Sequence, residues 1–132
     1  RLEFAMKNYI DSLLKCVLFK NMSSDEIERA LKNILNGIKS YKAEDIIAIE
    51  GESCDSVGII LVGNIEIHKS FASGKIVTIN HFEAGNIFGE ALVFSGSHQY
   101  PATIVSSNSS TLMFIPRTDI IKLMTLYYPI EF

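Results

Sequence analysis

The chain has 132 residues, of which 48% are hydrophobic and 20% are charged, which is typical of one soluble globular domain with its own core. Its formal net charge of −3 argues against nucleic-acid binding by this segment, because phosphate contacts need clustered lysines and arginines. No apolar run reaches the ~18 residues that a membrane span needs, and Lys7, Asp11 and Lys15 interrupt the N-terminal apolar residues, so no signal peptide is visible.

The first 37 residues show the apolar periodicity of two helices. Five apolar residues recur every three or four positions and predict a helix near 7–19: Ile10, Leu13, Leu14, Val17 and Leu18. A second helix is expected over 23–36, because Ser23 and Glu26 have the spacing of a capping box and Gly37 follows where a C-terminal cap belongs. The chain does not begin with Met, so residues 1–5 are expected to be foreign to the natural protein, and the end at Phe132 is expected to be a cut.

From Ser40 to Pro116 the pattern changes to short apolar runs separated by turn residues. Six runs are expected to be strands: 46–49, 57–62, 65–67, 76–82, 102–105 and 111–115. Many short strands at regular spacing predict an all-β sandwich or barrel of about eight strands. Helical periodicity returns over 118–126, and Pro129 is expected to begin another helix.

Three stretches follow one another at a definite spacing. They are the helix junction Leu18-Phe19-Lys20-Asn21-Met22-Ser23, the hairpin 59–67 with the sequence IILVGNIEI, and the turn Gly85-Asn86-Ile87-Phe88-Gly89-Glu90. Together they resemble the sensor domain of the bacterial Crp/Fnr transcription regulators and, more broadly, cyclic-nucleotide-binding domains. The resemblance covers about residues 13–132. One departure is Glu44, which stands where the family often has a turn glycine.

The resemblance implies a fold and a domain organisation. Residues 1–132 would form one mainly β domain with flanking α-helices, a double-stranded β-helix or jelly roll of the cyclic-nucleotide-binding type. A long dimerisation helix would begin near Pro129, and a helix-turn-helix DNA-binding domain would follow it. Nearly all of that helix and all of that domain would lie beyond Phe132.

The resemblance also implies a ligand site. In the family, a short helix begins at the Gly-Glu pair and its free N–H groups hold a cyclic phosphate. Here the candidate effector-binding residues lie in two segments: Phe88, Gly89, Glu90, Ala91 and Leu92, followed by Tyr100, Pro101 and Ala102. Glu90 would accept a hydrogen bond from the ribose hydroxyl.

Tyr100 occupies the position where the family has the arginine that binds the phosphate. Tyrosine can donate one hydrogen bond but cannot neutralise a charge, and the stretch from Ile76 to Pro116 contains neither Lys nor Arg. Losing one partner of a buried charge pair costs on the order of 3–5 kcal/mol, or roughly a hundred- to several-thousand-fold in affinity. A cyclic nucleotide is therefore disfavoured as the ligand.

Two interpretations of this site are left open. The retained amides, Glu90 and the tyrosine would suit a neutral or weakly anionic small molecule with a flat apolar part. Alternatively, Tyr100 plugs the cavity, and the domain is a dimerisation scaffold without a ligand. The two differ in whether a pocket exists beside Glu90.

Other chemistry finds little support in the sequence. His68, His81 and His98 lie in different strands or loops without ligand-like spacing, so neither a metal nor a haem is expected. Cys16 and Cys54 form no CxxC motif, so reduced cysteines in a cytoplasmic protein are expected, with Cys16 on the core face of its helix. No pairing of a nucleophile with a base indicates an enzyme.

We therefore interpret the chain as the cytoplasmic effector-sensing domain of a bacterial Crp/Fnr-like transcription regulator. Its partners would be an unidentified small-molecule effector and a second copy of the whole protein, with DNA bound only through the missing C-terminal domain and with no membrane partner. The alternative is a stand-alone cyclic-nucleotide-binding module that regulates another protein.

Overall fold

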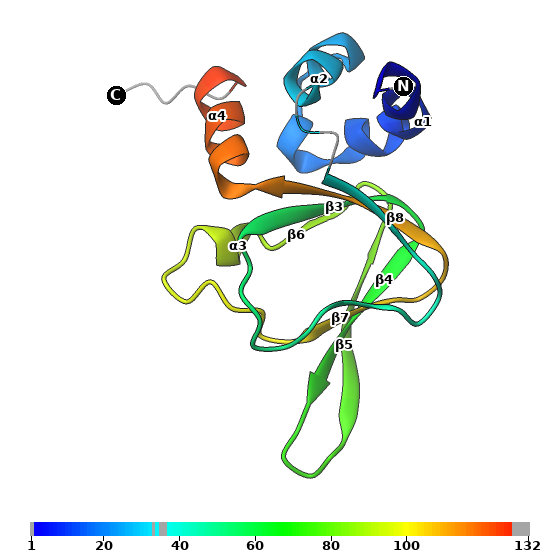
Figure 1. The fold of residues 1–132 in the computed structure, drawn as a ribbon, viewed down its shortest axis with the longest axis vertical. Helices are drawn as coiled ribbons and strands as arrows, with labels where there is room; N and C mark the ends of the chain where they lie inside the picture. Colours follow the sequence, from blue (N-terminus) through cyan, green and yellow to red (C-terminus); the bar gives the residue numbers. More distant parts are fainter. Residues whose placement is uncertain (1, 33, 35–36, 128–132) are drawn as a thin grey trace.

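The structure is a computed structural model that describes residues 2–32, 34 and 37–127. The helical elements are α1 (Leu2–Lys15), the 3-10 turn η1 (Val17–Phe19), α2 (Ser24–Leu31), α3 (Glu90–Val93) and α4 (Arg117–Tyr127). The strands are β1 (Ile38–Tyr41), β2 (Ile46–Ala48), β3 (Ser56–Val62), β4 (Asn64–Ser70), β5 (Ile76–Glu83), β6 (Ile87–Phe88), β7 (Thr103–Ser106) and β8 (Ser110–Pro116). Helices α1, α2 and α4 gather at one end, and the β4–β5 hairpin extends at the other (Figure 1).

The strands form two antiparallel four-stranded sheets. One has the order β1-β8-β3-β6 and the other β2-β7-β4-β5. The chain crosses from the first sheet to the second at Gly63, between β3 and β4. This arrangement, with helices flanking the sheets, confirms the predicted mainly β jelly roll of about eight strands.

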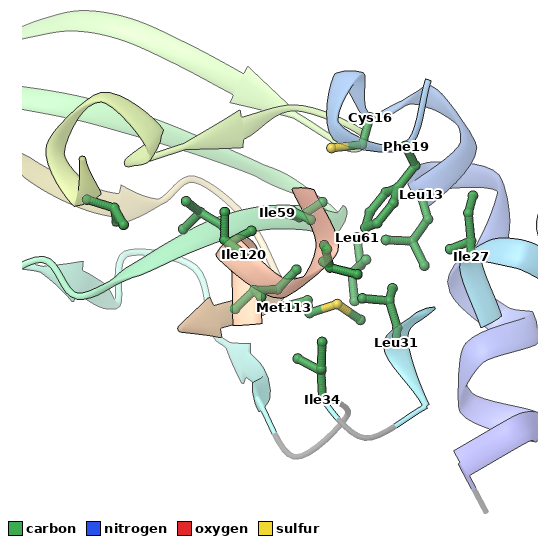
Figure 2. Close-up of a cluster of buried hydrophobic side chains, with 14 of the residues drawn as sticks. Leu13, Cys16, Phe19, Ile27, Leu31, Ile34, Ile59, Leu61, Met113 and Ile120 are labelled. Carbon is green, nitrogen blue, oxygen red and sulfur yellow. The ribbon is translucent and has the colours of Figure 1, made fainter. Parts of the chain in front are cut away.

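Two groups of buried side chains hold the layers together. The larger lies between the β3–β8 sheet and the helices, where Leu13, Phe19 and Ile27 meet side chains of the sheet and of α4 (Figure 2). The smaller lies between the two sheets, and its buried members are Ala48, Ile60, Ile65, Phe88, Ile104 and Leu112. Strand β3 contributes to both, because successive side chains alternate between faces. This explains why its apolar run is continuous.

The predicted helices are present, but not all of them end where they were predicted to end. Helix α1 ends at Lys15, not near residue 19, because Cys16 has an extended backbone (φ −73°, ψ 132°) and the chain continues as η1. Cys16 is buried as expected, although it lies just beyond the helix. The predicted helix 118–126 agrees with α4.

The second helix begins as predicted and ends early. The Ser23 N–H donates to Glu26 Oε1 (2.9 Å) and the Glu26 N–H donates to Ser23 Oγ (3.2 Å), which confirms the capping box. The helix ends at Leu31, so Gly37 is not its cap. A Cβ on Gly37 would lie 2.2 Å from the Phe114 carbonyl oxygen, so close backbone approach explains this glycine. Residues 33, 35–36, Tyr128 and Pro129 lie outside the described residues.

Two strands, β1 and β6, were not predicted from the sequence. Strand β1 is partly buried only at its ends, and β6 is two residues long and pairs with Gly58 and Ile59. Glu44 has a φ of 71°, a left-handed conformation that glycine adopts more readily. Glu44 stands where the family often has a turn glycine, so it is a strained residue in a turn that the fold retains.

Candidate functional site

The turn that begins the predicted site is set by Gly89. This residue joins β6 to α3 with a φ of 88°. A Cβ there would lie 3.2 Å from the Ser56 carbonyl oxygen and 3.3 Å from Cys54 Sγ. Both the left-handed backbone and the close packing therefore favour glycine.

Helix α3 presents backbone N–H groups at this turn. The Leu92 and Val93 N–H groups donate to the Gly89 carbonyl at 3.1 and 2.9 Å. The N–H groups of Glu90 and Ala91 precede these bonds and have no partner within the helix. The Glu90 side chain is exposed. The turn therefore keeps the donors and the carboxylate expected of it.

A cavity of about 250 Å³ lies beside this turn. Its lining includes all of the predicted site residues except Ala91, which is exposed on α3. The rest of the lining comes from the β4–β5 hairpin and β7: Ile67, Ile79, Asn80, Phe82 and Ile104. The sequence motifs did not point to the hairpin residues, because these residues precede the Gly-Glu turn and belong to none of the matching stretches except Ile67. Most of the wall is apolar, so the cavity suits the apolar part of a small ligand.

Tyr100 stands at the side of this cavity without closing it. Its backbone is fixed by two hydrogen bonds, from its N–H to the Glu52 carbonyl (2.9 Å) and from the Gly51 N–H to its carbonyl (2.8 Å). Its half-buried ring packs against both hydrophobic clusters and also borders a second cavity of about 300 Å³. A pocket therefore exists beside Glu90, which weighs against the interpretation of Tyr100 as a plug.

The hydroxyl of Tyr100 lies in a partly buried environment. Burial raises its pKa strongly, and a side-chain interaction with the Cys54 thiol raises it further. Cys54 in turn donates to the Ser56 carbonyl (3.4 Å) and lies beneath Gly89. The Tyr100 hydroxyl is therefore neutral at physiological pH.

One charged residue near the site was not anticipated from the sequence. Lys69, on β4, donates from Nζ to the Pro101 carbonyl (2.8 Å) and to Glu50 Oε2 (3.1 Å). The alternation of Ile65, Ile67 and Lys69 along one strand was the available signal, since every second residue shares a face. Lys69 precedes the Gly89-Glu90 pair, so it lies outside the stretch after that pair in which the family has its arginine.

The remaining candidates do not assemble into a site. His68 Nε2 lies 2.9 Å from Glu66 Oε1, and that interaction is the main cause of a lowered pKa of the Glu66 carboxyl. Among residues 2–32, 34 and 37–127, no group of His, Cys, Asp or Glu is arranged to hold a metal ion. Cys16 and Cys54 are both buried, free thiols. No described helix is long and apolar enough to cross a membrane.

Comparison with known proteins gives one family match. The family model described as "Cyclic nucleotide-binding domain" matches residues 38–127, which include the Gly89 turn and the segment around Tyr100. No curated protein sequence matches the chain.

Three solved structures illustrate the likeness in fold. The sensor domain of the transcriptional regulator DNR from Pseudomonas aeruginosa is 17% identical with a TM-score of 0.74, over 92% of this chain and 79% of that one. The Thermus thermophilus catabolite activator protein is 19% identical with a TM-score of 0.71, over 83% and 50%. The regulatory domain of Toxoplasma gondii PKA, crystallised with cAMP, is 20% identical with a TM-score of 0.71, over 92% and 45%. The chain thus spans about half of the last two, and such identities show the fold alone.

Proposed function

The chain belongs to the cyclic nucleotide-binding domain family, and we propose that it is the effector-sensing domain of a bacterial Crp/Fnr-like transcription regulator. In this proposal it acts in the cytoplasm as part of a homodimer. Binding of a small molecule would control a DNA-binding domain that follows it in the whole protein. The likeness to a transcriptional sensor domain and to a catabolite activator protein supports this assignment. The family is a regulatory one, and we propose no catalytic activity.

The observation that carries the proposal is the cavity beside Glu90. It is open and mostly apolar, and it adjoins the start of α3 at Gly89 and Glu90. At about 250 Å³ it lies just below the ~300–1,000 Å³ typical of ligand pockets. A compact molecule with a flat apolar part and a hydrogen-bonding edge fits it better than a whole nucleotide does. Ile67 and Phe82 would contact the apolar part, and the α3 amides would hold an oxygen.

A physical link runs from the cavity to the last helix. Arg117, the first residue of α4, donates from Nε to the carbonyl of Val93, the last residue of α3 (3.2 Å). Its guanidinium lies 5.6 Å from the centre of the Phe94 ring. Ile120 and Leu123 anchor α4 in the larger buried cluster. A ligand that moves α3 would therefore bias the position of α4, which would lead toward the proposed DNA-binding domain.

The test uses the longer protein that contains this domain. Its melting temperature and its affinity for its DNA site would be measured against a panel of small metabolites. We expect at least one to shift both, because a ligand at 100 times its Kd stabilises the native state by about 2.7 kcal/mol. If no compound in the panel shifts the melting temperature or the DNA affinity, the proposal of a small-molecule effector is wrong.

A matched pair of substitutions locates the effect. Ala102 is buried and lines the cavity, whereas Ala91 is exposed and does not. Ala102→Leu should fill the cavity and abolish the shift in melting temperature, and Ala91→Leu should preserve it. Circular dichroism of each variant without ligand verifies the fold. Equal responses of the two variants would place the binding site elsewhere.

A second candidate is a stand-alone cyclic-nucleotide-binding module that regulates another protein. The likeness to the regulatory domain of a protein kinase over 92% of this chain favours it. The tyrosine at position 100 weighs against it, because the site then lacks a charge to balance a cyclic phosphate. Measuring the affinity of the chain for cyclic nucleotides distinguishes the two candidates.

A further inference from the structure

We infer that Lys69 supplies the positive charge of this site and that the ligand is a small organic carboxylate bound at the Pro101 edge of the cavity. The inference rests on the proposed function, since it assumes that the cavity beside Glu90 is the effector site. It names the chemical class of the effector and a residue that selects it. The charge would come from strand β4 and not from the segment that carries it elsewhere in the family.

A hydrogen bond to Pro101 places Lys69 beside the cavity. Ile65 is buried and Ile67 lines the cavity, and every second residue of a strand shares a face. The β4–β7 register runs from Ile65 opposite Ser106 to His68 opposite Thr103, and Lys69 itself pairs with Val77 of β5, just past a register shift between Ile67 and His68. Lys69 does not itself line the cavity, but its hydrogen bond to the Pro101 carbonyl puts the ammonium beside a residue that does.

The ammonium group has a donor left for a ligand. Lysine has three N–H donors, and two of them go to Glu50 Oε2 and the Pro101 carbonyl. Among the described residues no third acceptor is found. The side chain is 37% exposed, so the group is not sealed inside the protein. A ligand oxygen can therefore bind Lys69 without breaking either existing hydrogen bond.

The charges around Lys69 favour a ligand with one negative charge over a ligand with two. Glu50 already balances part of the ammonium charge, and Glu90 stands at the cavity as a further carboxylate. A dianion such as a phosphate monoester would add repulsion that one shared ammonium does not offset. Glu50 Oε1 is buried and has no hydrogen-bond partner in the described part of the chain. A hydroxyl on the ligand or a bound water would satisfy it.

The test compares two matched probes, benzoate and benzamide, which differ in charge and little in shape. Binding to the domain is followed through the amide NMR signals of Gly89 and Ala102, which both line the cavity. We expect benzoate to bind roughly two- to fivefold more tightly than benzamide, which is the upper part of the range for a partly exposed ion pair. Lys69→Met should erase the preference, and Lys69→Arg should retain it.

Two further variants sharpen the result. Lys75 is exposed on the β4–β5 hairpin and, unlike Lys69, has no hydrogen bond to a cavity-lining residue in the described part of the chain, so Lys75→Met should leave the preference unchanged. Glu50→Gln should increase it, because the competing carboxylate is removed. If both probes shift the cavity signals equally, or Lys69→Met behaves like the unmodified chain, the role of Lys69 is wrong while the cavity remains a binding site. If neither probe shifts these signals at millimolar concentration, both the inference and the proposed effector site fail.

Discussion

Replacing Tyr100 with arginine is expected to raise the affinity for cyclic AMP by roughly 30- to 100-fold, or about 2–3 kcal/mol. This gain lies below the full value of a buried charge pair because the position is only half-buried. The substitution puts a guanidinium beside Gly89 and the free N–H groups of α3, where it can bind the phosphate in a bidentate manner. Isothermal titration calorimetry of the variant and of the unmodified chain would measure the gain.

The control for this result is Tyr100→Phe. It keeps the ring that packs against both clusters and removes only the hydroxyl that contacts Cys54. We expect it to change cyclic AMP binding by less than about twofold, because the hydroxyl supplies no charge for the phosphate. Should Tyr100→Arg bind cyclic AMP no better than Tyr100→Phe, the missing charge would not be the reason for weak nucleotide binding. The limited size of the cavity would then be the better explanation.

Replacing Gly63 with alanine is expected to destabilise the fold by roughly 3 kcal/mol or more. Gly63 has a φ of 91° and connects the two sheets. A Cβ there would lie 2.5 Å from the Ser109 carbonyl oxygen and 2.8 Å from the Ser110 Cα. Backbone atoms cannot move aside as a flexible side chain can, so the β3–β4 connection itself would have to shift. Thermal or urea unfolding measures the loss.

Gly74→Ala separates the two causes of that loss. Gly74 has nearly the same φ, 89°, in the β4–β5 turn, but a Cβ added there would have no other atom within 4 Å. This variant should lose only the conformational part, about 1–2 kcal/mol. A difference of about 2 kcal/mol between the variants corresponds to roughly 6–10 °C in melting temperature. Equal losses would mean that the close packing at Gly63 relaxes without cost.

The fold could be predicted because its signals are local. The capping box of α2 depends on two residues three positions apart, and the periodicity of α4 on one short stretch. The sequence did not predict the elements, or the ends of elements, that depend on contacts with other parts of the chain. Strand β6 has only two residues and exists because it pairs with Gly58 and Ile59. Helix α1 gives way to η1 where Phe19 turns into the core.

The site was predictable in the same way, and only in part. The turn at Gly89 carries its own signal, since the glycine and the short helix are adjacent in the chain. The orientation of the Tyr100 hydroxyl depends on Cys54, which is 46 positions earlier in the sequence. The contact of Lys69 with the Pro101 carbonyl joins residues 32 positions apart. Both follow from how the sheets meet, which periodicity along one strand does not specify.

Calorimetric titration of the unmodified chain with cyclic AMP and cyclic GMP is the most direct test of the claim that this cyclic-nucleotide-type site serves another ligand. We expect no saturable heat at micromolar nucleotide, because Tyr100 provides no charge for the phosphate and the cavity of about 250 Å³ is small for a nucleotide. Any binding should be in the millimolar range. A dissociation constant in the low-micromolar range for either nucleotide would contradict the claim and favour the stand-alone cyclic-nucleotide-binding module.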